Sequence, residues 1–328
     1  MMKNSVQGVL VADRPGTRLS RVSSHILCSV PGSGAPCRIP FSAVSGIVLS
    51  ERVSCSPSLL LHALKRGITV SFSVTGANSP GFIVPAGKSR PQILWDQLSV
   101  FRSDDLRLRA AQWLVGQKIR SQRKQIRSWS SRCRSDSVKK AAAGLRSASA
   151  VVRLASSPEQ LRGIEGAAAR LYWSVFAEFA GCPAFFSSRS GHPALSPADS
   201  MLSFGYAVLA NQIASVALNK GLDLSLPCLH QDRTHFLPLP WDLIEPLRAP
   251  CVDRVVMAGF HRKRFAITDF SSDKSGAFCM SKDAKVKLLQ DLFESFSDSS
   301  ILFRKNIESI VCQYISMIHE VASHAFQP

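Results

Sequence analysis

The spacing of apolar residues divides the chain into two parts with different periods. In the first ninety residues, short runs rich in Val, Ile, Leu and Phe alternate with turn residues, which is typical of strands joined by tight turns. The stretch 58–67 has a helical pattern instead. We therefore predict a β-rich segment with one short helix, whose strands lie within residues 6–13, 23–30, 37–50, 68–74 and 81–85.

From about Pro91 onward, apolar residues recur with the period of a helix. The longest such run covers 104–129 and is dense in basic residues on its polar side. Its predicted apolar stripe consists of Ala111, Val115, Ile119 and Ile126. The second part of the chain is therefore predicted to be helical.

Two later helices are predicted to begin with the same local signal. Ser157 and Ser196 are each followed by a proline, Pro158 and Pro197, and by an acceptor side chain three positions after the serine. Serine at the N-cap with proline at the first helical position is a typical helix start. The second helix is predicted to end at Gly221, because glycine suits the left-handed residue after a helix.

The rest of the chain alternates between loops and helices. After a loop over 222–240, Pro246 limits a regular helix but leaves Asp242 and Glu245 about one turn apart, so that their side chains can converge. The stretch 264–296 is predicted to be a loop followed by an amphipathic helix. A last helix is predicted from about Ser300 to His324.

At 328 residues the chain is long enough to form two cores. We predict an α+β fold with a small N-terminal β-rich domain over residues 1–90 and a larger all-α domain over residues 91–328. Forty Lys and Arg residues against 23 Asp and Glu residues give a formal charge of +17. A polyanion is therefore the first partner to consider, and an anionic membrane surface the second.

The sequence predicts a cytoplasmic protein that does not enter the membrane. No run of about 18 uninterrupted apolar residues occurs, and the start of the chain lacks the apolar core of a signal peptide. The nine cysteines are widely spaced and include no C-x-x-C pair. This spacing argues against a disulfide framework and against a thiolate zinc site.

Glu165 is the acid whose position most needs an explanation. It stands in "LRGIEGAAARLYW" (161–173), among the small residues of a helix that reads as buried. An ionised carboxylate there needs a partner. Either a neighbouring Arg162 or Arg170 pairs with it, or it joins His230 and one of the two later acids to bind Mn²⁺ or Mg²⁺. Spacing alone leaves both explanations open.

Four motifs in this order resemble those of the CRISPR-associated integrase family, the proteins that capture and insert new spacers. They are "LRGIEGAAARLYW", "SFGYAVL", "GLDLSLPCLH" and "WDLIEPLRAPCVDRVV". The resemblance also includes "RGITVSFSVTGANSPG", "AAQWLVGQKIRSQRKQI" and "SGAFCMSKDAKVKLL", and so covers nearly the whole chain. An ordered set of this kind is far more specific than any single short motif.

The resemblance implies a catalytic metal site. It makes Glu165, His230 and Glu245 the ligands of Mn²⁺ or Mg²⁺, and it makes Asp242 either a further ligand or a group that orients one. The metal would neutralise charge growing on a scissile phosphate and help to activate the attacking hydroxyl, so no serine or cysteine nucleophile is needed.

The resemblance also implies the substrates and partners. In the family, the 3′-hydroxyl of an incoming DNA fragment attacks repeat DNA, and water in its place gives endonuclease activity. The family acts on double-stranded DNA as a homodimer formed through the β domain, and a small ferredoxin-fold companion protein bridges two dimers. The second domain is the catalytic one.

Basic residues mark candidate contacts to DNA phosphates. Between Lys118 and Arg146 there are ten basic residues and one acid, with Trp129 among them as a candidate stacking surface, although a merely solvated helix face has the same composition. Arg248 follows the expected ligand turn and can bind a phosphate bidentately. The predicted DNA-contact residues are Lys118, Arg120, Arg123, Lys124, Arg127, Arg170 and Arg248.

Other residues receive structural interpretations. The helical spacing of Tyr172, Trp173 and Phe176 predicts core packing, and His235 is only a weak candidate for the site. The chain departs from the family pattern where Asp199, Ser203 and Pro227 replace an asparagine, another polar residue and a glycine.

Two alternatives to an active CRISPR integrase remain open: a catalytically silent DNA-binding scaffold, and a transposon-encoded integrase of the same fold.

Overall fold

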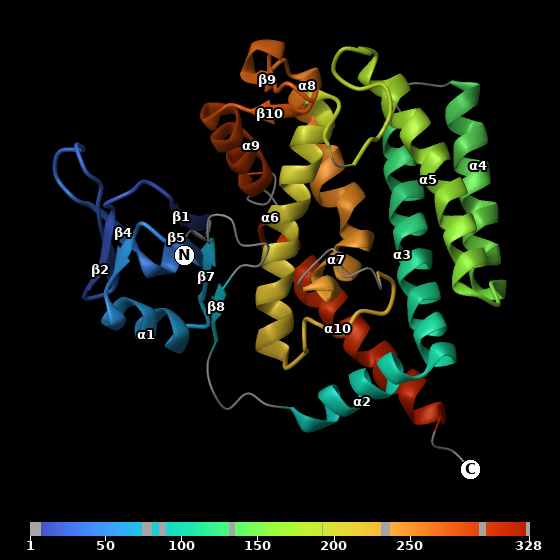
Figure 1. The fold of residues 1–328 in the computed structure, drawn as a ribbon, viewed down its shortest axis with the longest axis horizontal. Coiled ribbons are helices and arrows are strands. Elements are labelled where there is room, and N and C mark those ends of the chain that lie inside the picture. Colours follow the sequence, from blue (N-terminus) through green and yellow to red (C-terminus); the bar gives the residue numbers. More distant parts are fainter. Residues whose placement is uncertain are drawn as a thin grey trace, which may run out of the picture.

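The two main sheets and the long helices lie on opposite sides of the molecule (Figure 1). The strands of these sheets come from the first part of the chain, and helices make up nearly all of the second part. The predicted α+β fold is therefore confirmed. The computed structural model describes residues 8–73, 81–84, 90–130, 135–191, 193–230, 237–294 and 300–325.

The first part contains two four-stranded sheets. In one, with the order β1-β5-β7-β8, the first three strands are parallel and β8 runs antiparallel to β7. In the other, with the order β4-β3-β2-β6, the first three are antiparallel and β6 runs parallel to β2. The bounds are β1 Gly8–Ala12, β2 Arg18–Val22, β3 His25–Ser29, β4 Cys37–Pro40, β5 Val44–Ser50, β6 Ser54–Cys55, α1 Pro57–Lys65, β7 Thr69–Ser73 and β8 Gly81–Ile83.

The two sheets and α1 share one apolar core. Ile47 and Val70 come from the first sheet, Leu19 and Ile26 from the second, and Leu59 from α1; all five are buried in one cluster. Leu19 and Ile26 each lie one residue inside the start of a short strand, so that one face of the sheet is buried while neighbouring positions meet solvent.

The second part consists of long helices around a larger core. All four residues of the predicted stripe on α3 are buried. The helix bounds are α2 Pro91–Arg102, α3 Asp104–Ser130, α4 Asp136–Val151, α5 Pro158–Ala180, α6 Pro197–Lys220, α7 Pro238–Ile244, α8 Arg254–His261, α9 Lys282–Glu294 and α10 Ser300–Ala325. The short helices between them that matter for the site are η2 Val152–Leu154, η3 Glu245–Leu247 and the π-helix η4 Arg248–Asp253.

The helical part also contains a β-hairpin where a loop was predicted. The strands β9 (Phe270–Ser272) and β10 (Phe278–Met280) pair antiparallel. Each strand has only three residues, which is too short to show the alternation by which strands are recognised. The Asp273 carboxylate accepts backbone N–H groups of the turn, and Gly276 has a φ of 79°. Asp273 and Gly276 are thus the residues that form the turn between the two strands.

The helix starts predicted at Ser157 and Ser196 are confirmed. Their hydroxyls accept the N–H groups of Gln160 and Asp199 at 3.3 and 3.1 Å. The residue after α6 is Gly221, with a φ of 90°, as predicted. Among the described helices, α6 alone has the length and hydropathy of a membrane span, and 56% of its most apolar window is buried within the protein. Buried residues on several of its sides make α6 the central helix of the core.

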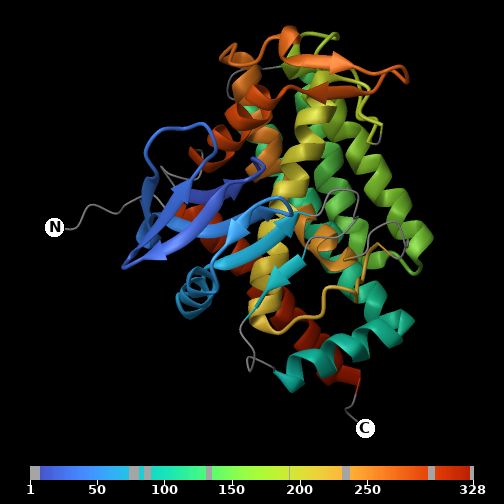
Figure 2. The same ribbon diagram turned by 60° about the vertical axis from the view of Figure 1, so that its left-hand side comes forward.

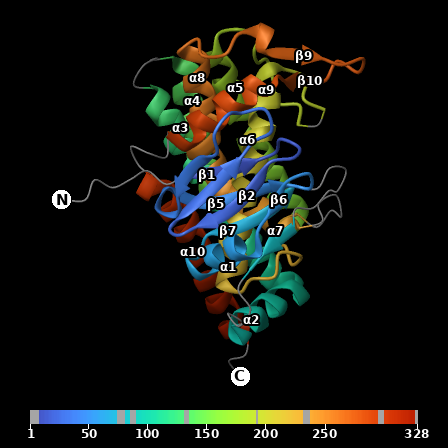
Figure 3. The ribbon, with the colours of Figure 1, turned by 90° about the vertical axis from the view of Figure 1, so that its left-hand side faces the viewer.

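The β-rich part rests against one side of α6. Figures 2 and 3 show the two sheets in front of this helix from two directions. The hydroxyl of Thr69 on β7 forms a hydrogen bond with the hydroxyl of Ser215 on α6. A side chain at Gly46 on β5 would approach Gln212 of the same helix. The core helix is therefore also the platform for the sheets.

The aromatic residues of α5 form part of the core, as predicted. Tyr172 and Phe176 are fully buried, and Trp173 packs partly buried beside them. Trp129, at the end of α3, belongs to the same cluster, with its ring centroid 6.0 Å from that of Tyr172 and 5.5 Å from that of Phe179. Trp129 is only 6% exposed, so its interpretation as a surface for stacking bases is wrong.

Candidate active site

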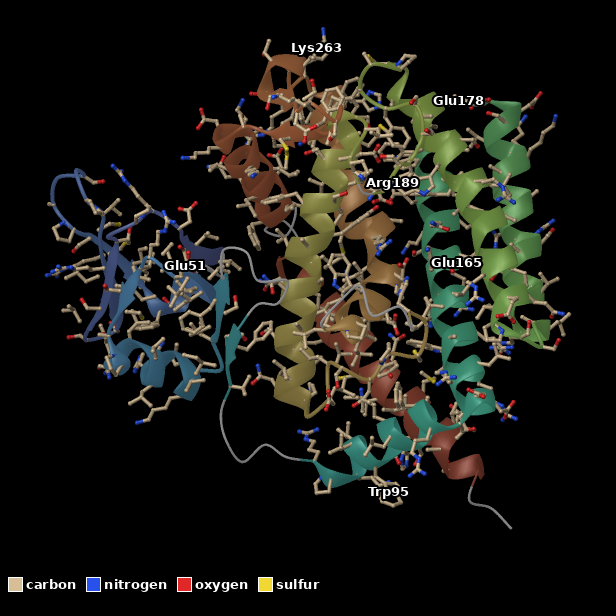
Figure 4. All side chains as sticks on the ribbon, viewed as in Figure 1. Glu51, Trp95, Glu165, Glu178, Arg189 and Lys263 are labelled. Carbon is tan, nitrogen blue, oxygen red and sulfur yellow. The ribbon has the colours of Figure 1, made fainter. Side chains whose placement is uncertain are left out.

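Two carboxylates from different helical segments meet at one ammonium group. The Nζ of Lys118 on α3 donates a hydrogen bond to Glu165 Oε1 on α5 at 2.5 Å, and it lies 2.8 Å from Oε2 of Glu245, the first residue of η3. Figure 4 labels Glu165 where α3 and α5 lie side by side. Glu165 is half-buried, and Lys118 is the cation that pairs with it.

The two arginines considered as partners of Glu165 are engaged elsewhere or exposed. Arg162 points outward and pairs with Glu159 at 2.7 Å. Arg170 is exposed, and its guanidinium folds back over Gly166. Neither forms an ion pair with Glu165 among the described residues, so the simple local explanation for this acid does not hold.

Glu245 and Asp242 point to different places because the helix changes its pitch between them. α7 ends at Ile244, just before Pro246, which cannot donate the next helical hydrogen bond. The chain then continues as the short η3 and the π-helix η4. Glu245 is directed toward Lys118, whereas Asp242 is directed toward the loop that carries His230.

Asp242 acts on the loop and on the imidazole. Its carboxylate is fully buried and accepts the backbone N–H groups of Cys228, Leu229 and His230 at 2.8, 2.9 and 3.0 Å. Its Oδ1 also lies 2.7 Å from His230 Nδ1. Because a carboxylate only accepts, Nδ1 carries the proton in this bond. His230 Nε2 is then the nitrogen left for a metal or substrate, and it lies 3.9 Å from Glu245 Oε1.

The charges of the site stabilise one another. Burial opposes ionisation of Glu245, yet Arg248 and Lys118 outweigh it and lower its pKa from 4.5 to about 2. Burial likewise lowers the pKa of Lys118, but Glu245 and Glu165 outweigh that effect and raise it. For His230, the hydrogen bond that its Nδ1 donates to Asp242 and the charge of Glu245 prevail over burial, so its pKa is raised. Three acids, Glu165, Glu245 and Asp242, thus face three basic groups, Lys118, Arg248 and His230.

Arg248 connects the site to a second buried carboxylate. Its Nη2 lies 3.0 Å from Glu245 Oε1, and its guanidinium carbon stands 4.6 Å from the ring centroid of Tyr206. The hydroxyl of Tyr206 donates to Asp253 at 2.6 Å, and that of Tyr172 donates to the same carboxylate at 2.7 Å. The sequence analysis did not identify Asp253. It is the last residue of η4, directly before α8, and only the fold shows that it is buried.

Two of the departures from the family pattern belong to one local cluster. Arg189 donates to the buried carboxylate of Asp199 at 2.6 Å and to the hydroxyl of Ser203 at 3.2 Å. The same guanidinium lies 5.7 Å from the ring of Tyr206. The acid at position 199 therefore has a half-buried cation as its partner. The third departure, Pro227, is buried beside the loop held by Asp242.

The donor set of the site suits a hard divalent cation. Two carboxylates and an imidazole nitrogen are ligands that Mn²⁺ and Mg²⁺ accept, and the Lys118 ammonium shows that positive charge is stable between the carboxylates. As the side chains stand, no three His, Cys, Asp or Glu residues of the described chain are arranged to hold a metal ion. An ion bound by Glu165, Glu245 and His230 therefore requires the flexible Lys118 side chain to leave its place.

The seven residues predicted to contact DNA separate into two groups. Lys118 and Arg248 belong to the site itself, and Lys118 is only 12% exposed. The others are exposed or half-buried on α3 and α5: Arg120, Arg123, Lys124, Arg127 and Arg170. His235 lies outside the described residues.

Solved structures share this fold. A Cas1 protein from Thermotoga maritima aligns with a TM-score of 0.75 at 18% identity, over 95% of this chain and 97% of that chain. A casposase bound to an integration product aligns with a TM-score of 0.75 at 17% identity, over 98% and 92%. A Cas6-RT-Cas1–Cas2 complex aligns with a TM-score of 0.72 at 18% identity, over 100% of this chain and 36% of that chain.

Sequence comparison gives the relationship more specifically. The CRISPR-associated endonuclease Cas1 1 of Chlorobaculum tepidum is 31% identical over 304 residues, which cover 88% of this chain and 85% of that protein. The family model for the CRISPR associated protein Cas1 matches residues 10–294. Because this match spans most of the sequence and includes Glu165, His230 and Glu245, the chain belongs to the Cas1 family.

Proposed function

We propose that this protein is a metal-dependent DNA integrase and endonuclease that inserts DNA fragments as new spacers during CRISPR adaptation. The observation that carries the proposal is the meeting of Glu165 and Glu245 at one cationic point, with His230 Nε2 beside Glu245. The relative from Chlorobaculum tepidum is named an endonuclease, and the casposase structure contains an integration product; both support the reaction class.

Glu165, Glu245 and His230 would hold Mn²⁺ or Mg²⁺, which supplies neutralisation of the charge on the scissile phosphate and a lower pKa for the attacking hydroxyl. Asp242 keeps His230 in the tautomer with Nε2 available. Arg248, held between Glu245 and the ring of Tyr206, presents a guanidinium to the phosphate. These residues bind and orient the reacting groups.

The proposed reaction exchanges one phosphodiester bond for another. The 3′ oxygen of the incoming strand bonds to phosphorus, and the bond from phosphorus to the target strand's 3′ oxygen breaks. The proton of the attacking hydroxyl ends on the released 3′ oxygen. With water as the attacking group, the same exchange cuts the strand. No side-chain nucleophile takes part, in agreement with a site that contains carboxylates, bases and an imidazole.

We also propose the partners that the family resemblance implies. The substrates are the incoming double-stranded DNA and the CRISPR repeat. The protein acts as a homodimer through its β-rich part, together with a small ferredoxin-fold companion. The Cas6-RT-Cas1–Cas2 structure is a complex that contains Cas1 together with Cas2, which supports such a partnership.

The test is strand transfer of a short duplex with free 3′-hydroxyl ends into a supercoiled plasmid that carries a repeat. Wild type is compared with Glu165→Ala and His230→Ala, in Mn²⁺ or Mg²⁺, with and without the companion. We expect joined products from wild type alone, and loss of at least 100-fold in both variants, in the range found when a group that stabilises transition-state charge is removed. Both variants should still bind DNA.

The alternatives give different results in the same assay. A silent scaffold would bind the duplex but would neither join nor cut it under any of these conditions. A transposon-type integrase would insert element ends without preference for the repeat. Either outcome would overturn the proposed function while leaving the family assignment in place.

A further inference from the structure

A second basic site lies on the side of α3 opposite the active site. Lys118 and Arg120 are two positions apart, and at 3.6 residues per turn their side chains point to opposite sides of the helix. On the outer side, α3 meets the end of α4 and η2 around an open hollow of about 210 Å³. Six of the residues that line it are Arg109, Gln112, Trp113, Gly116, Arg120 and Arg153.

The lining of this hollow carries three guanidinium groups and no carboxylate. Arg109 has a partner outside it, Asp105, at 3.2 Å. Neither Arg120 nor Arg153 forms an ion pair with an acid of the described chain. Burial and the nearby charge of Arg153 lower the pKa of Arg120. Two like charges held together in this way cost free energy, which a bound anion would offset.

Two features of the surrounding residues fix the walls of the hollow and leave space inside it. The Nε2 of Gln112 donates to the carbonyl oxygen of Ala155 at 2.8 Å and so fixes the chain next to Arg153. A Cβ at Gly116 would stand 3.8 Å from both terminal nitrogens of Arg120. The absence of a side chain at Gly116 therefore leaves room beneath the guanidinium, and Trp113 adds an aromatic wall.

The basic row continues along the exposed side of α3 beyond the hollow. Lys124 and Arg127 follow Arg120 at helical spacing and are exposed. From Arg109 to Arg127 the row extends about 27 Å along the helix axis, at 1.5 Å per residue. A single small anion would use only the hollow, whereas a row of this length matches several successive phosphates of one strand.

We propose that this hollow binds a backbone phosphate of a second DNA duplex, separate from the strand at the active site. The inference rests on the proposed function, because an integrase must hold an incoming duplex and a target duplex together. Arg120 and Arg153 bind the phosphate, and the exposed row on α3 guides the neighbouring part of the backbone.

The test measures duplex affinity against salt concentration in EDTA, so that the result does not depend on catalysis. The variant R120Q/R153Q removes the two charges. The variant Gly116→Met fills the hollow and leaves every charge in place. The matched control is R262Q/K263Q, which removes two exposed basic residues at the far end of the helical part, where Figure 4 labels Lys263.

We expect R120Q/R153Q to reduce the slope of log affinity against log salt by about 1, because the two arginines share one phosphate and each lost phosphate contact lowers the slope by about 0.9. Gly116→Met should weaken binding at least threefold, and the control should match wild type. If R120Q/R153Q binds the duplex with the same affinity and the same salt slope as wild type, the proposal is overturned, even if strand transfer proceeds as proposed.

Inorganic phosphate serves as a second probe. If it stabilises wild type but not R120Q/R153Q while duplex binding is equal, the hollow serves a small phosphate ligand and the DNA proposal is wrong.

Discussion

Lys118 bonds to both carboxylates that the proposed metal would need. Replacing it by Gln removes the cation between Glu165 and Glu245, although Arg248 still pairs with Glu245, and removing one partner of a buried pair costs about 3 kcal/mol. We expect K118Q to unfold at lower temperature than wild type in EDTA, and to gain more stability than wild type when Mn²⁺ is added.

Thermal unfolding with and without Mn²⁺ measures both effects. The control is Lys124→Gln, an exposed lysine on the same helix, which should behave as wild type. An equal gain from Mn²⁺ in K118Q and wild type would contradict a common position for the ammonium and the metal.

Asp242 is the second residue whose role the geometry makes specific. An Asn at this position retains one accepting oxygen but cannot accept the N–H groups of Cys228 and Leu229 through its nitrogen. We expect Asp242→Asn to lower the free energy of unfolding by about 2 kcal/mol. Urea unfolding measures the loss. Asp223→Asn, at an exposed acid, should change it by less than about 0.5 kcal/mol.

At the residue scale, the family motifs and the apolar stripe of α3 contain information on the site residues that the distribution of charges does not. Glu165, His230 and Glu245 were identified through motifs, and the structure places them near one another. Lys118 was grouped with the surface cations of its segment. Its spacing of three and four residues from Val115 and Leu114, both buried, places it on the inner side of α3, so the apolar stripe contained the signal for its burial.

Close packing between α6 and η4 depends on one glycine. A Cβ at Gly205 would stand 2.5 Å from Cγ1 of Val252, a contact that neither backbone can relieve cheaply. We expect Gly205→Ala to destabilise the protein by about 2 kcal/mol. Gly163, in the interior of α5, has nothing within 4 Å of such a Cβ. Gly163→Ala should therefore stabilise the protein, by about 0.5 to 1 kcal/mol.

Chemical denaturation of the two alanine variants separates packing from helix propensity. Destabilisation of similar size in both would mean that the contact between Gly205 and Val252 is not the cause. Loss in the first variant with gain in the second would support the close approach of these two elements, which also positions Arg248.

The carboxylate of Asp253 joins α5, α6 and the end of η4 through two tyrosine hydroxyls. Burial raises its pKa above 3.8 in spite of these hydrogen bonds. The folded protein therefore holds this proton more tightly than the unfolded chain does. Its contribution to stability is present below pH 3.8 and is lost as pH rises through the folded pKa.

An Asp253→Asn variant has no such proton to lose. We expect the free energy of unfolding of wild type, relative to this variant, to fall as pH increases above 3.8. Urea unfolding at a series of pH values gives the difference between the two curves. A difference that does not vary with pH would mean that Asp253 titrates alike in both states.

At the element scale, local signals predicted what is local. Serine, proline and glycine at 157–158, 196–197 and 221 marked helix ends correctly because a cap depends only on neighbouring residues. The hairpin at 270–280 was missed because its strands are too short to show a period. The change to a π-helix after Pro246 was not predicted either; this segment packs against α3 and α6, which are distant in sequence.

On the scale of the whole molecule, the charge is unevenly placed. In the active site the carboxylates of Glu165, Glu245 and Asp242 offset the charges of Lys118 and Arg248, so the metal-free site adds no excess positive charge. The excess of +17 lies elsewhere, and part of it forms the row on the outer side of α3. DNA affinity is therefore expected to depend on the outer surface, and chemistry on the balanced interior.

The two-part organisation followed from the change in period near Pro91, but the meeting of the site residues did not. Positions 118, 165, 230 and 245 lie on four segments far apart in sequence, and only the packing of α3, α5 and η3 brings them together. A pattern with a period of a few residues has no information about such distances, so the family motifs were needed to connect them.

The most direct test of the site is Mn²⁺ binding followed by electron paramagnetic resonance. The wild-type protein should bind Mn²⁺ with a nitrogen coupling from an imidazole. That coupling should disappear in His230→Ala, and affinity should fall at least tenfold in Glu165→Gln and Glu245→Gln but not in Glu178→Gln, an exposed acid farther along α5. Equal Mn²⁺ affinity and an unchanged nitrogen coupling in all variants would contradict a metal site formed by Glu165, His230 and Glu245.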